Sequence, residues 1–235
     1  MGLIGTSSGK DHNGKTMWES LQDFSREKPI WGTCAGMILL AERCVGTSAV
    51  ITDGQSLIGG IDITVCRNYF GSQISSFEMA TPPPPGLEST DTFPGIFIRA
   101  PAILSGGPDV EVLGKVVATP CRQAAVTLQE LERKIAAGEN VVKMGVVDAL
   151  DRKLGLEYIV VVKPADDSPE EKKDLTTDES KTIELPGAAD GTNAREVICA
   201  ARKGNMLCTA FHPELTDDYR WHEYFVKMVN ESMKS

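Results

Sequence analysis

A short apolar run leads directly into a cysteine flanked by glycines, and this order of residues leaves few folds open. The run Pro29-Ile30-Trp31 precedes Gly32-Thr33-Cys34-Ala35-Gly36, and a second apolar run, residues 37–41, follows. The flanking glycines permit a strained turn from strand to helix that projects the central side chain above a sheet. The pattern predicts a nucleophile elbow in an α/β fold, with a helix N-terminus that favours the Cys34 thiolate. On this motif alone, close packing around an unreactive buried cysteine is an equal alternative.

A second apolar run delivers a histidine and a carboxylate near the C-terminus. Residues 206–211 have the composition of a buried strand, and His212 and Glu214 follow it. In a Cys-His-Glu arrangement the imidazole removes the thiol proton and later protonates the leaving group, while the carboxylate fixes the imidazole tautomer. Among the three histidines only His212 has this setting, and we expect His12 and His222 to be surface residues.

Four segments between residues 30 and 215 carry the motifs of one family. They are residues 31–42 around the cysteine, residues 67–73 with 76–78, residues 97–101, and residues 210–215 around the histidine. The first and last motifs occur in many amidotransferases, whereas the Arg-Asn-x-Phe-Gly and Phe-Ile-Arg-Ala-Pro motifs are specific to a subfamily. In these segments the chain resembles the glutaminase subunit of pyridoxal 5'-phosphate synthase, a class I glutamine amidotransferase of the triad type.

This resemblance implies a fold and a function. The fold is an α/β three-layer sandwich around a mostly parallel sheet, similar to flavodoxin. The implied reaction is the hydrolysis of L-glutamine to glutamate and ammonia. The ammonia passes to a (β/α)8-barrel synthase subunit, in a large hetero-oligomer, for the synthesis of pyridoxal 5'-phosphate, a form of vitamin B6. We expect no cofactor and no metal ion.

The resemblance also implies the roles of individual residues. Its catalytic residues are the nucleophile Cys34, the general acid and base His212, and the orienting carboxylate Glu214. The residues that it places along the glutamine site are Arg67, Ile98 and Arg99. An arginine can hold the α-carboxylate of glutamine through paired hydrogen bonds. Outside this context, each arginine would be read as a solvated charge at the end of a strand.

One part of the family domain has no counterpart in this chain. Family members begin with a strand, a helix and a second strand that ends in a Gly-Gly-Glu-Ser type loop, whereas residues 1–4 match the helix after that loop. We therefore expect an N-terminally truncated form of the domain. The backbone N–H of Ala35 remains as one oxyanion donor, and the loss of a second donor costs on the order of 10² to 10³ in rate.

Composition is consistent with one globular domain over residues 1–235. The chain has 41% hydrophobic and 24% charged residues, and it contains no apolar run long enough to cross a membrane. Its six cysteines include no closely spaced pair, which favours a reducing, cytoplasmic setting. A net charge of −9 argues against nucleic acid as a partner.

A second motif, near the N-terminus, suggests a different function. Residues 9–16 match the G-x-x-x-x-G-K-[ST] pattern of a phosphate-binding loop, but no buried strand precedes them. We favour a polar loop before a helix whose capping box is formed by Thr16 and Glu19. The expected inward face of this helix carries Met17, Leu21 and Phe24.

The rest of the chain alternates between strand and helix patterns. Strands are expected over residues 60–65, 95–98, 141–147, 157–163 and 196–200. Helices are expected after Thr127, as N-cap, and over residues 217–229, with Trp221, Phe225 and Met228 inward. Surface insertions are expected over residues 80–94, 105–135 and 164–195.

Three alternatives to an active glutaminase stay open at this level. A cysteine hydrolase or peptidase of the same fold would use the elbow and His212 without needing Arg67 and Arg99. A truncated, inactive binding subunit would keep the surface for the synthase. A nucleotide-binding protein would use Lys15 in the phosphate-binding loop.

Overall fold

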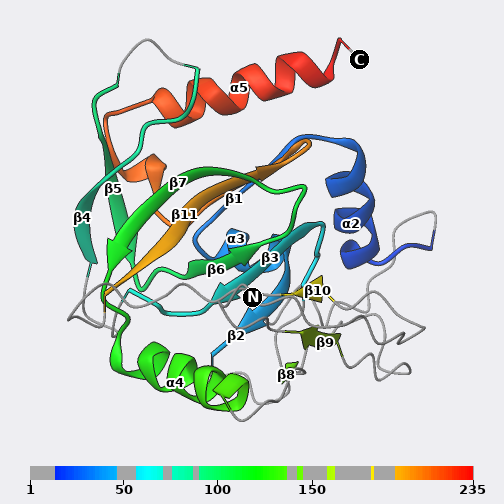
Figure 1. Ribbon diagram of the computed structural model, residues 1–235. Helices are drawn as coiled ribbons and strands as arrows, with labels where there is room; N and C mark the ends of the chain where they lie inside the picture. Colours follow the sequence, from blue (N-terminus) through cyan, green and yellow to red (C-terminus); the bar gives the residue numbers. More distant parts are fainter. Residues whose placement is uncertain are drawn as a thin grey trace, which may run out of the picture.

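The computed structural model describes residues 14–46, 57–70, 76–86, 90–136, 142–144, 158–161, 181–182 and 194–234. A seven-stranded sheet lies at the centre of this part of the chain (Figure 1). Its strands are β1 (Ile30–Thr33), β2 (Ala41–Val45), β3 (Ile61–Cys66), β6 (Ala102–Gly106), β7 (Glu111–Ala118), β11 (Arg195–Lys203) and β12 (Met206–Thr209). Their order is β1-β12-β11-β6-β3-β2, and β7 also pairs with β11. All six residues of β3 are buried, as expected for a strand covered on both faces.

The α/β class is confirmed, but the sheet is mixed and the expectation of a mostly parallel sheet is wrong. Only the pairs β1–β12 and β2–β3 are parallel among the described strands of this sheet. Strand β11 runs antiparallel to β6, β7 and β12, and β3 runs antiparallel to β6. The turn between β11 and β12 is tight, with Gly204 at a φ of +57°. Such a hairpin enforces antiparallel pairing, because a parallel pair needs a crossover of a dozen residues or more.

Two smaller sheets complete the described strands. Strands β4 (Ser76–Thr81) and β5 (Phe93–Ile98) form an antiparallel hairpin. Strands β8 (Val142–Met144), β9 (Tyr158–Val161) and β10 (Lys181–Thr182) form the other sheet. The strands expected from the sequence are thus confirmed, most of them with shifted ends. The surface loop expected over residues 80–94 is shorter than expected, because Thr81 and Phe93 at its two ends are buried in the hairpin.

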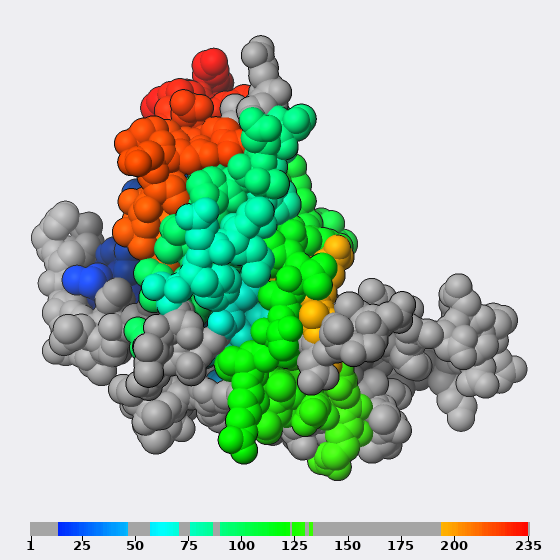
Figure 2. Space-filling model, turned by 90° about the vertical axis from the view of Figure 1, so that its left-hand side faces the viewer, coloured from blue at the N-terminus to red at the C-terminus, as the bar shows by residue number. Residues whose placement is uncertain are grey.

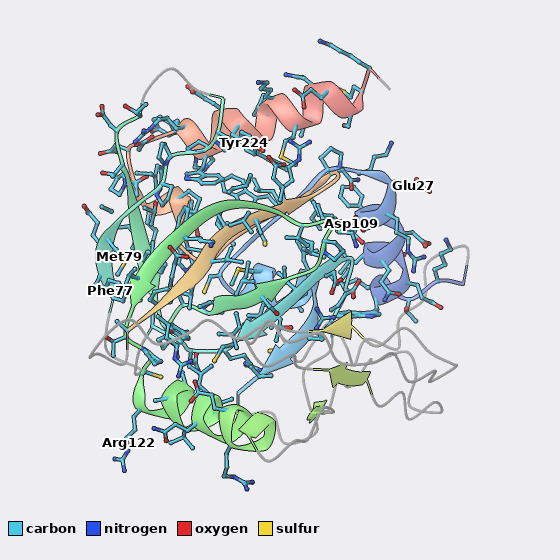
Figure 3. The ribbon with its side chains drawn as sticks, viewed as in Figure 1. Glu27, Phe77, Met79, Asp109, Arg122 and Tyr224 are labelled. Atoms are coloured by element: carbon cyan, nitrogen blue, oxygen red, sulfur yellow. The ribbon has the colours of Figure 1, made fainter. Side chains whose placement is uncertain are left out.

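Helices lie on two sides of the central sheet. They are α2 (Met17–Glu27), α3 (Ala35–Leu40), α4 (Arg122–Ala136), the 3₁₀ turn η1 (Pro213–Leu215) and α5 (Arg220–Ser232). Figures 1 and 2, which share a vertical axis, both place α5 above the strands and α4 below them. Tyr224 points from α5 toward the sheet, where its hydroxyl accepts a hydrogen bond from Arg202 of β11 (Figure 3). Helix α3 packs directly against the sheet, where it contacts β1, β12, β2 and β3.

Two helices differ from expectation in detail. The capping box of α2 is confirmed, since Thr16 and Glu19 exchange hydrogen bonds. Its buried residues are Trp18 and Ser25, however, while Met17 and Phe24 are about half exposed. Helix α4 begins at Arg122, so Thr127, expected as its cap, lies inside it. In α5, Trp221, Tyr224 and Met228 are buried and Phe225 packs against the core, largely as expected.

Residues 105–135, expected as a surface insertion, contribute a strand of the central sheet, a helix and several buried side chains. Strand β7 pairs with β11 from Glu111 to Ala118, and α4 follows. Buried side chains from this stretch include Val116, Ala118, Ala124 and Leu128. Residues 164–195 lie mostly outside the described residues, as do residues 9–13 of the phosphate-loop pattern and His12. A single domain over residues 1–235 stays a prediction. None of the described helices is both long and apolar enough to span a membrane.

Candidate active site

Cys34 stands at a strained turn between β1 and α3. Its φ of +48° is a left-handed value that side chains other than glycine rarely adopt. The turn brings the strand and the helix into very close approach, since a Cβ on Gly32 would lie 2.5 Å from the carbonyl carbon of Gly36. The Cys34 amide donates to the Thr209 carbonyl at 2.8 Å, which ties the turn to β12. The turn thus has the geometry of the predicted nucleophile elbow.

The register of two parallel strands places His212 at the same end of the sheet as Cys34. Thr33, the last residue of β1, pairs with Thr209, the last residue of β12. The chain then continues to His212 and into η1, where Nδ1 of His212 lies 2.7 Å from Oε1 of Glu214. The His212 side chain is 20% exposed and that of Glu214 is 49% exposed, so the pair borders on solvent.

Strand β5 contacts both Cys34 and His212. The thiol of Cys34 donates to the carbonyl of Ile98 over 3.9 Å, and the amide of His212 donates to the carbonyl of Ile96 at 2.8 Å. Figure 2 shows the chain around η1 in orange beside the hairpin of β4 and β5 in blue-green. A predicted glutamine-site residue, Ile98, therefore lies directly at the nucleophile, and Arg99 follows it at the exposed end of the strand.

Backbone strain gathers in the segments that the resemblance singles out. Among the described residues, the non-glycine residues with a positive φ are Cys34, Asn68 and Arg99. Asn68 follows Arg67, and the amide of Phe70 in the same turn donates to the Ala100 carbonyl at 3.2 Å. The turn after β3 and the turn after β5 thus lie side by side. Such strain persists only where the surrounding structure enforces it, and it is common at functional sites.

An aromatic cluster that the sequence did not reveal packs behind these turns. Phe77 of β4, labelled in Figure 3, stacks on Phe97 with ring centroids 5.4 Å apart and an interplanar angle of 8°. Phe97 also meets Phe70 at 4.6 Å and Phe211 at 5.8 Å. Each ring comes from one of the segments that carry family motifs. The cluster therefore joins the arginine turns to the segment that precedes His212.

The surroundings of Cys34 favour the neutral thiol. Burial raises its pKa most strongly, and the Glu214 carboxylate raises it further. The backbone N–H of Ala35 and the Arg99 guanidinium lower the pKa, but they do not outweigh burial. The expectation that the helix N-terminus favours a thiolate is thus wrong for the site as a whole, since α3 is short and the sulfur is largely desolvated. A neighbouring base is needed to remove the proton.

Other residues that the sequence analysis considered, His222 and Lys15, have partners of their own elsewhere in the structure. His222, expected at the surface, is half-buried in α5 against the Trp31 ring, with centroids 5.3 Å apart. Within the described ranges, no group of three or more histidine, cysteine or acidic side chains is arranged to hold a metal ion. Lys15 of the phosphate-loop pattern pairs with Asp23 of α2.

Comparison with known proteins places the chain in a family. The model of the SNO glutamine amidotransferase family matches residues 5–130 and 176–231. A probable pyridoxal 5'-phosphate synthase subunit PDX2 of Arabidopsis thaliana is 39% identical over 220 residues, which are 92% of this chain and 64% of that protein. The pyridoxal 5'-phosphate synthase subunit PdxT of Methanocella arvoryzae is 34% identical, over 90% of this chain and 65% of its own length. A probable subunit pdx2 of Dictyostelium discoideum is 31% identical, over 97% of this chain and 66% of that protein. The chain thus spans just under two thirds of the length of these relatives, and it belongs to the SNO glutamine amidotransferase family.

Proposed function

We propose that this chain is a glutaminase subunit that hydrolyses L-glutamine to glutamate and ammonia. The observation that carries the proposal is the elbow cysteine at the end of β1, with the His212–Glu214 pair following the adjacent end of β12. Family membership supports the same reaction. The relatives are named as subunits of pyridoxal 5'-phosphate synthase, which supports the use of the ammonia in the synthesis of that compound.

The first half of the reaction forms a thioester. Because Nδ1 of His212 is engaged by Glu214, Nε2 is the nitrogen that takes the proton from the Cys34 thiol. The sulfur then attacks the side-chain amide carbon of glutamine, and the Ala35 N–H stabilises the oxyanion that develops. When this intermediate collapses, the C–N bond breaks, and the imidazolium of His212 donates its proton to the departing nitrogen, which leaves as ammonia.

The second half of the reaction releases glutamate. His212, now neutral, takes a proton from a water molecule, and the resulting hydroxide attacks the thioester carbon. The C–S bond breaks, the sulfur regains its proton from His212, and glutamate leaves. One glutamine and one water thereby become one glutamate and one ammonia.

In this proposal the two strained turns, after β3 and after β5, bind the substrate. Arg67 and Arg99 stand at the ends of β3 and β5, and the hydrogen bond from Phe70 to Ala100 holds their turns together. A guanidinium in this position can take the α-carboxylate of glutamine through two parallel hydrogen bonds. Ile98 lines the site beside the thiol.

The partner in this proposal is the synthase subunit, a (β/α)8 barrel, in a hetero-oligomer located in the cytoplasm. Glutamine is the substrate and no cofactor is required. The names of the relatives, as subunits of one synthase, support a complex of this kind.

Glutamate release from glutamine, measured with and without the synthase subunit, tests the proposal. We expect release that is abolished by Cys34→Ala and by His212→Ala. Co-purification with the synthase subunit in the absence of any glutamate release would instead identify a binding subunit. Hydrolysis of peptides or esters in preference to glutamine would identify another cysteine hydrolase of this fold.

A further inference from the structure

The turn that carries Arg67 is held in a strained conformation by its surroundings. Asn68, with a φ of +51°, lies between Arg67 and Tyr69. The turn is tied at its start, where the Arg67 amide donates to Val45 of β2 at 3.0 Å, and at its end, where Phe70 bonds to Ala100. Asparagine accepts a left-handed backbone more readily than most residues, but an isolated turn would not keep it.

Cys121 supplies the ties in the middle of this turn. Its thiol donates to the Asn68 carbonyl at 2.9 Å, and its backbone amide donates to the Tyr69 carbonyl at 2.8 Å. The Tyr69 hydroxyl donates back to the Ala118 carbonyl at 3.1 Å, just before Cys121. Three hydrogen bonds therefore join the strained turn to the last residue of β7 and to Cys121, just before α4. This anchor lies 53 residues along the chain from Asn68.

We propose that Cys121 is a positioning residue for glutamine binding, which acts through the Asn68 carbonyl to hold Arg67 in the orientation that receives the substrate carboxylate. The inference rests on the proposed function. Cys121 acts at a distance from the reacting atoms, through the turn that carries Arg67. Its thiol hydrogen bond holds the peptide unit between Asn68 and Tyr69, and through the strained backbone of Asn68 it sets the direction in which the Arg67 side chain leaves the end of β3.

The neighbouring thiols do not replace this contact. Cys66, at the end of β3, donates only over 3.8 Å to the Arg67 carbonyl, and burial raises its pKa to about 12. Cys44 on β2 directs its thiol to the carbonyl of Val45 within its own strand. Among the three thiols near this turn, Cys121 is thus the one that donates its hydrogen bond to Asn68, the residue with the strained backbone.

The test measures glutamine affinity in the Cys34→Ala protein, in which binding is separated from turnover. Isothermal titration with L-glutamine is compared with and without a second change, Cys121→Ala or Cys121→Val. Both changes remove the donor, and valine also fills the space. We expect the dissociation constant to rise about three- to tenfold, the factor for loss of one neutral hydrogen bond. Cys121→Ser, which can still donate to the Asn68 carbonyl, should stay within about twofold.

Cys199→Ala is the matched control, because it removes a buried thiol from β11, a strand that leads into neither arginine turn. It should leave the affinity unchanged, whatever it does to the melting temperature. In the otherwise native chain, Cys121→Ala should raise the KM for glutamine and leave kcat within about twofold. Amide exchange of residues 66–70 should quicken in the variants that lack the donor.

One outcome would refute only the positioning role of Cys121, and a different outcome would refute the glutaminase function as well. If the Cys34→Ala protein binds glutamine and the folded Cys121→Ala and Cys121→Val forms bind it equally well, the positioning role is refuted while the glutaminase proposal stands. If the Cys34→Ala protein, alone and with the synthase subunit, binds no glutamine, the proposed function itself fails and the positioning role fails with it.

Discussion

The two glycines that flank Cys34 look equivalent in the sequence, yet the structure predicts opposite effects of replacing them. A Cβ on Gly32 would lie 2.5 Å from the Gly36 carbonyl carbon, 2.6 Å from its oxygen and 2.9 Å from Cδ1 of Leu40. Two of these atoms are backbone atoms of α3, so the clash cannot be relieved by a side-chain rotation alone. Apart from its chain neighbours and the backbone of its own helix, a Cβ on Gly36 would meet no atom of the described residues within 4 Å.

These distances set the size of the expected effects. Gly32→Ala must push α3 away from β1, and overpacking of this kind costs about 1–3 kcal/mol of unfolding free energy. It also moves the turn that holds Cys34, and a shift of about 1 Å at a reacting atom can cost on the order of 10² in rate. Gly36→Ala lies within α3, where alanine is favoured over glycine by about 0.5–1 kcal/mol. It should therefore be neutral or slightly stabilising.

Urea denaturation followed by circular dichroism measures the first effect, and glutamate release measures the second. We expect Gly32→Ala to lose both stability and activity, and Gly36→Ala to keep both. If Gly36→Ala were as damaging as Gly32→Ala, the close approach of β1 and α3 would not be the reason for the glycine at position 32. If Gly32→Ala behaved like the native chain, the elbow geometry itself would be incorrect.

Three further predictions follow from charge and burial. The rate of Cys34 alkylation by iodoacetamide should rise with pH beyond the range of an ordinary thiol, because burial raises its pKa. Arg99→Gln should move this profile to higher pH and Glu214→Gln to lower pH, and unchanged profiles would contradict the stated electrostatics. Asp62→Ala should lower the unfolding free energy in urea denaturation by up to about 3–5 kcal/mol, because the 4%-exposed side chain of Arg43 loses its nearest carboxylate and keeps the more distant Glu42, at 3.7 Å. A loss under 1 kcal/mol would show that water or a neighbour replaces the pair. Stability should fall as pH rises above about 9, because four buried thiols ionise near pH 9 when unfolded and only near 12 when folded, so the unfolded state releases protons first. These thiols are Cys44, Cys66, Cys199 and Cys208. Thermal melts between pH 7 and 10.5 measure this, and a flat profile would contradict it.

Local features of the fold were predictable from the sequence. The elbow follows from glycines on either side of Cys34, and the capping box from the spacing of Thr16 and Glu19. The family motifs likewise mark His212 and the arginines as candidate site residues, and their roles stay predictions. The strain at Asn68 was also detectable, since asparagine after the end of a strand is a common left-handed residue.

Features that depend on distant residues were not predictable. The periodicity of α2 suggested Met17 and Phe24 as its inward face, but Trp18 is the side chain that the rest of the protein buries. Residues 105–135 were expected as a surface insertion, yet the pairing of β7 with β11, a strand distant in the sequence, brings part of this segment into the central sheet. The mixed sheet has both kinds of cause: the turn at Gly204 is local, but the antiparallel pairing of β6 with β11 and with β3 joins segments that are distant in the sequence.

The sequence by itself determined the elbow, its cysteine and the motifs around it, because each depends on residues within one turn of the chain. Only the tertiary structure decided how these segments meet. The pairing of β1 with β12 sets Cys34 and His212 at one end of the sheet, and β5 contacts both. The tertiary structure also decided the protonation state of the Cys34 thiol. Burial raises the pKa of this thiol more than the local helix N-terminus lowers it, and burial depends on everything that packs around the sulfur.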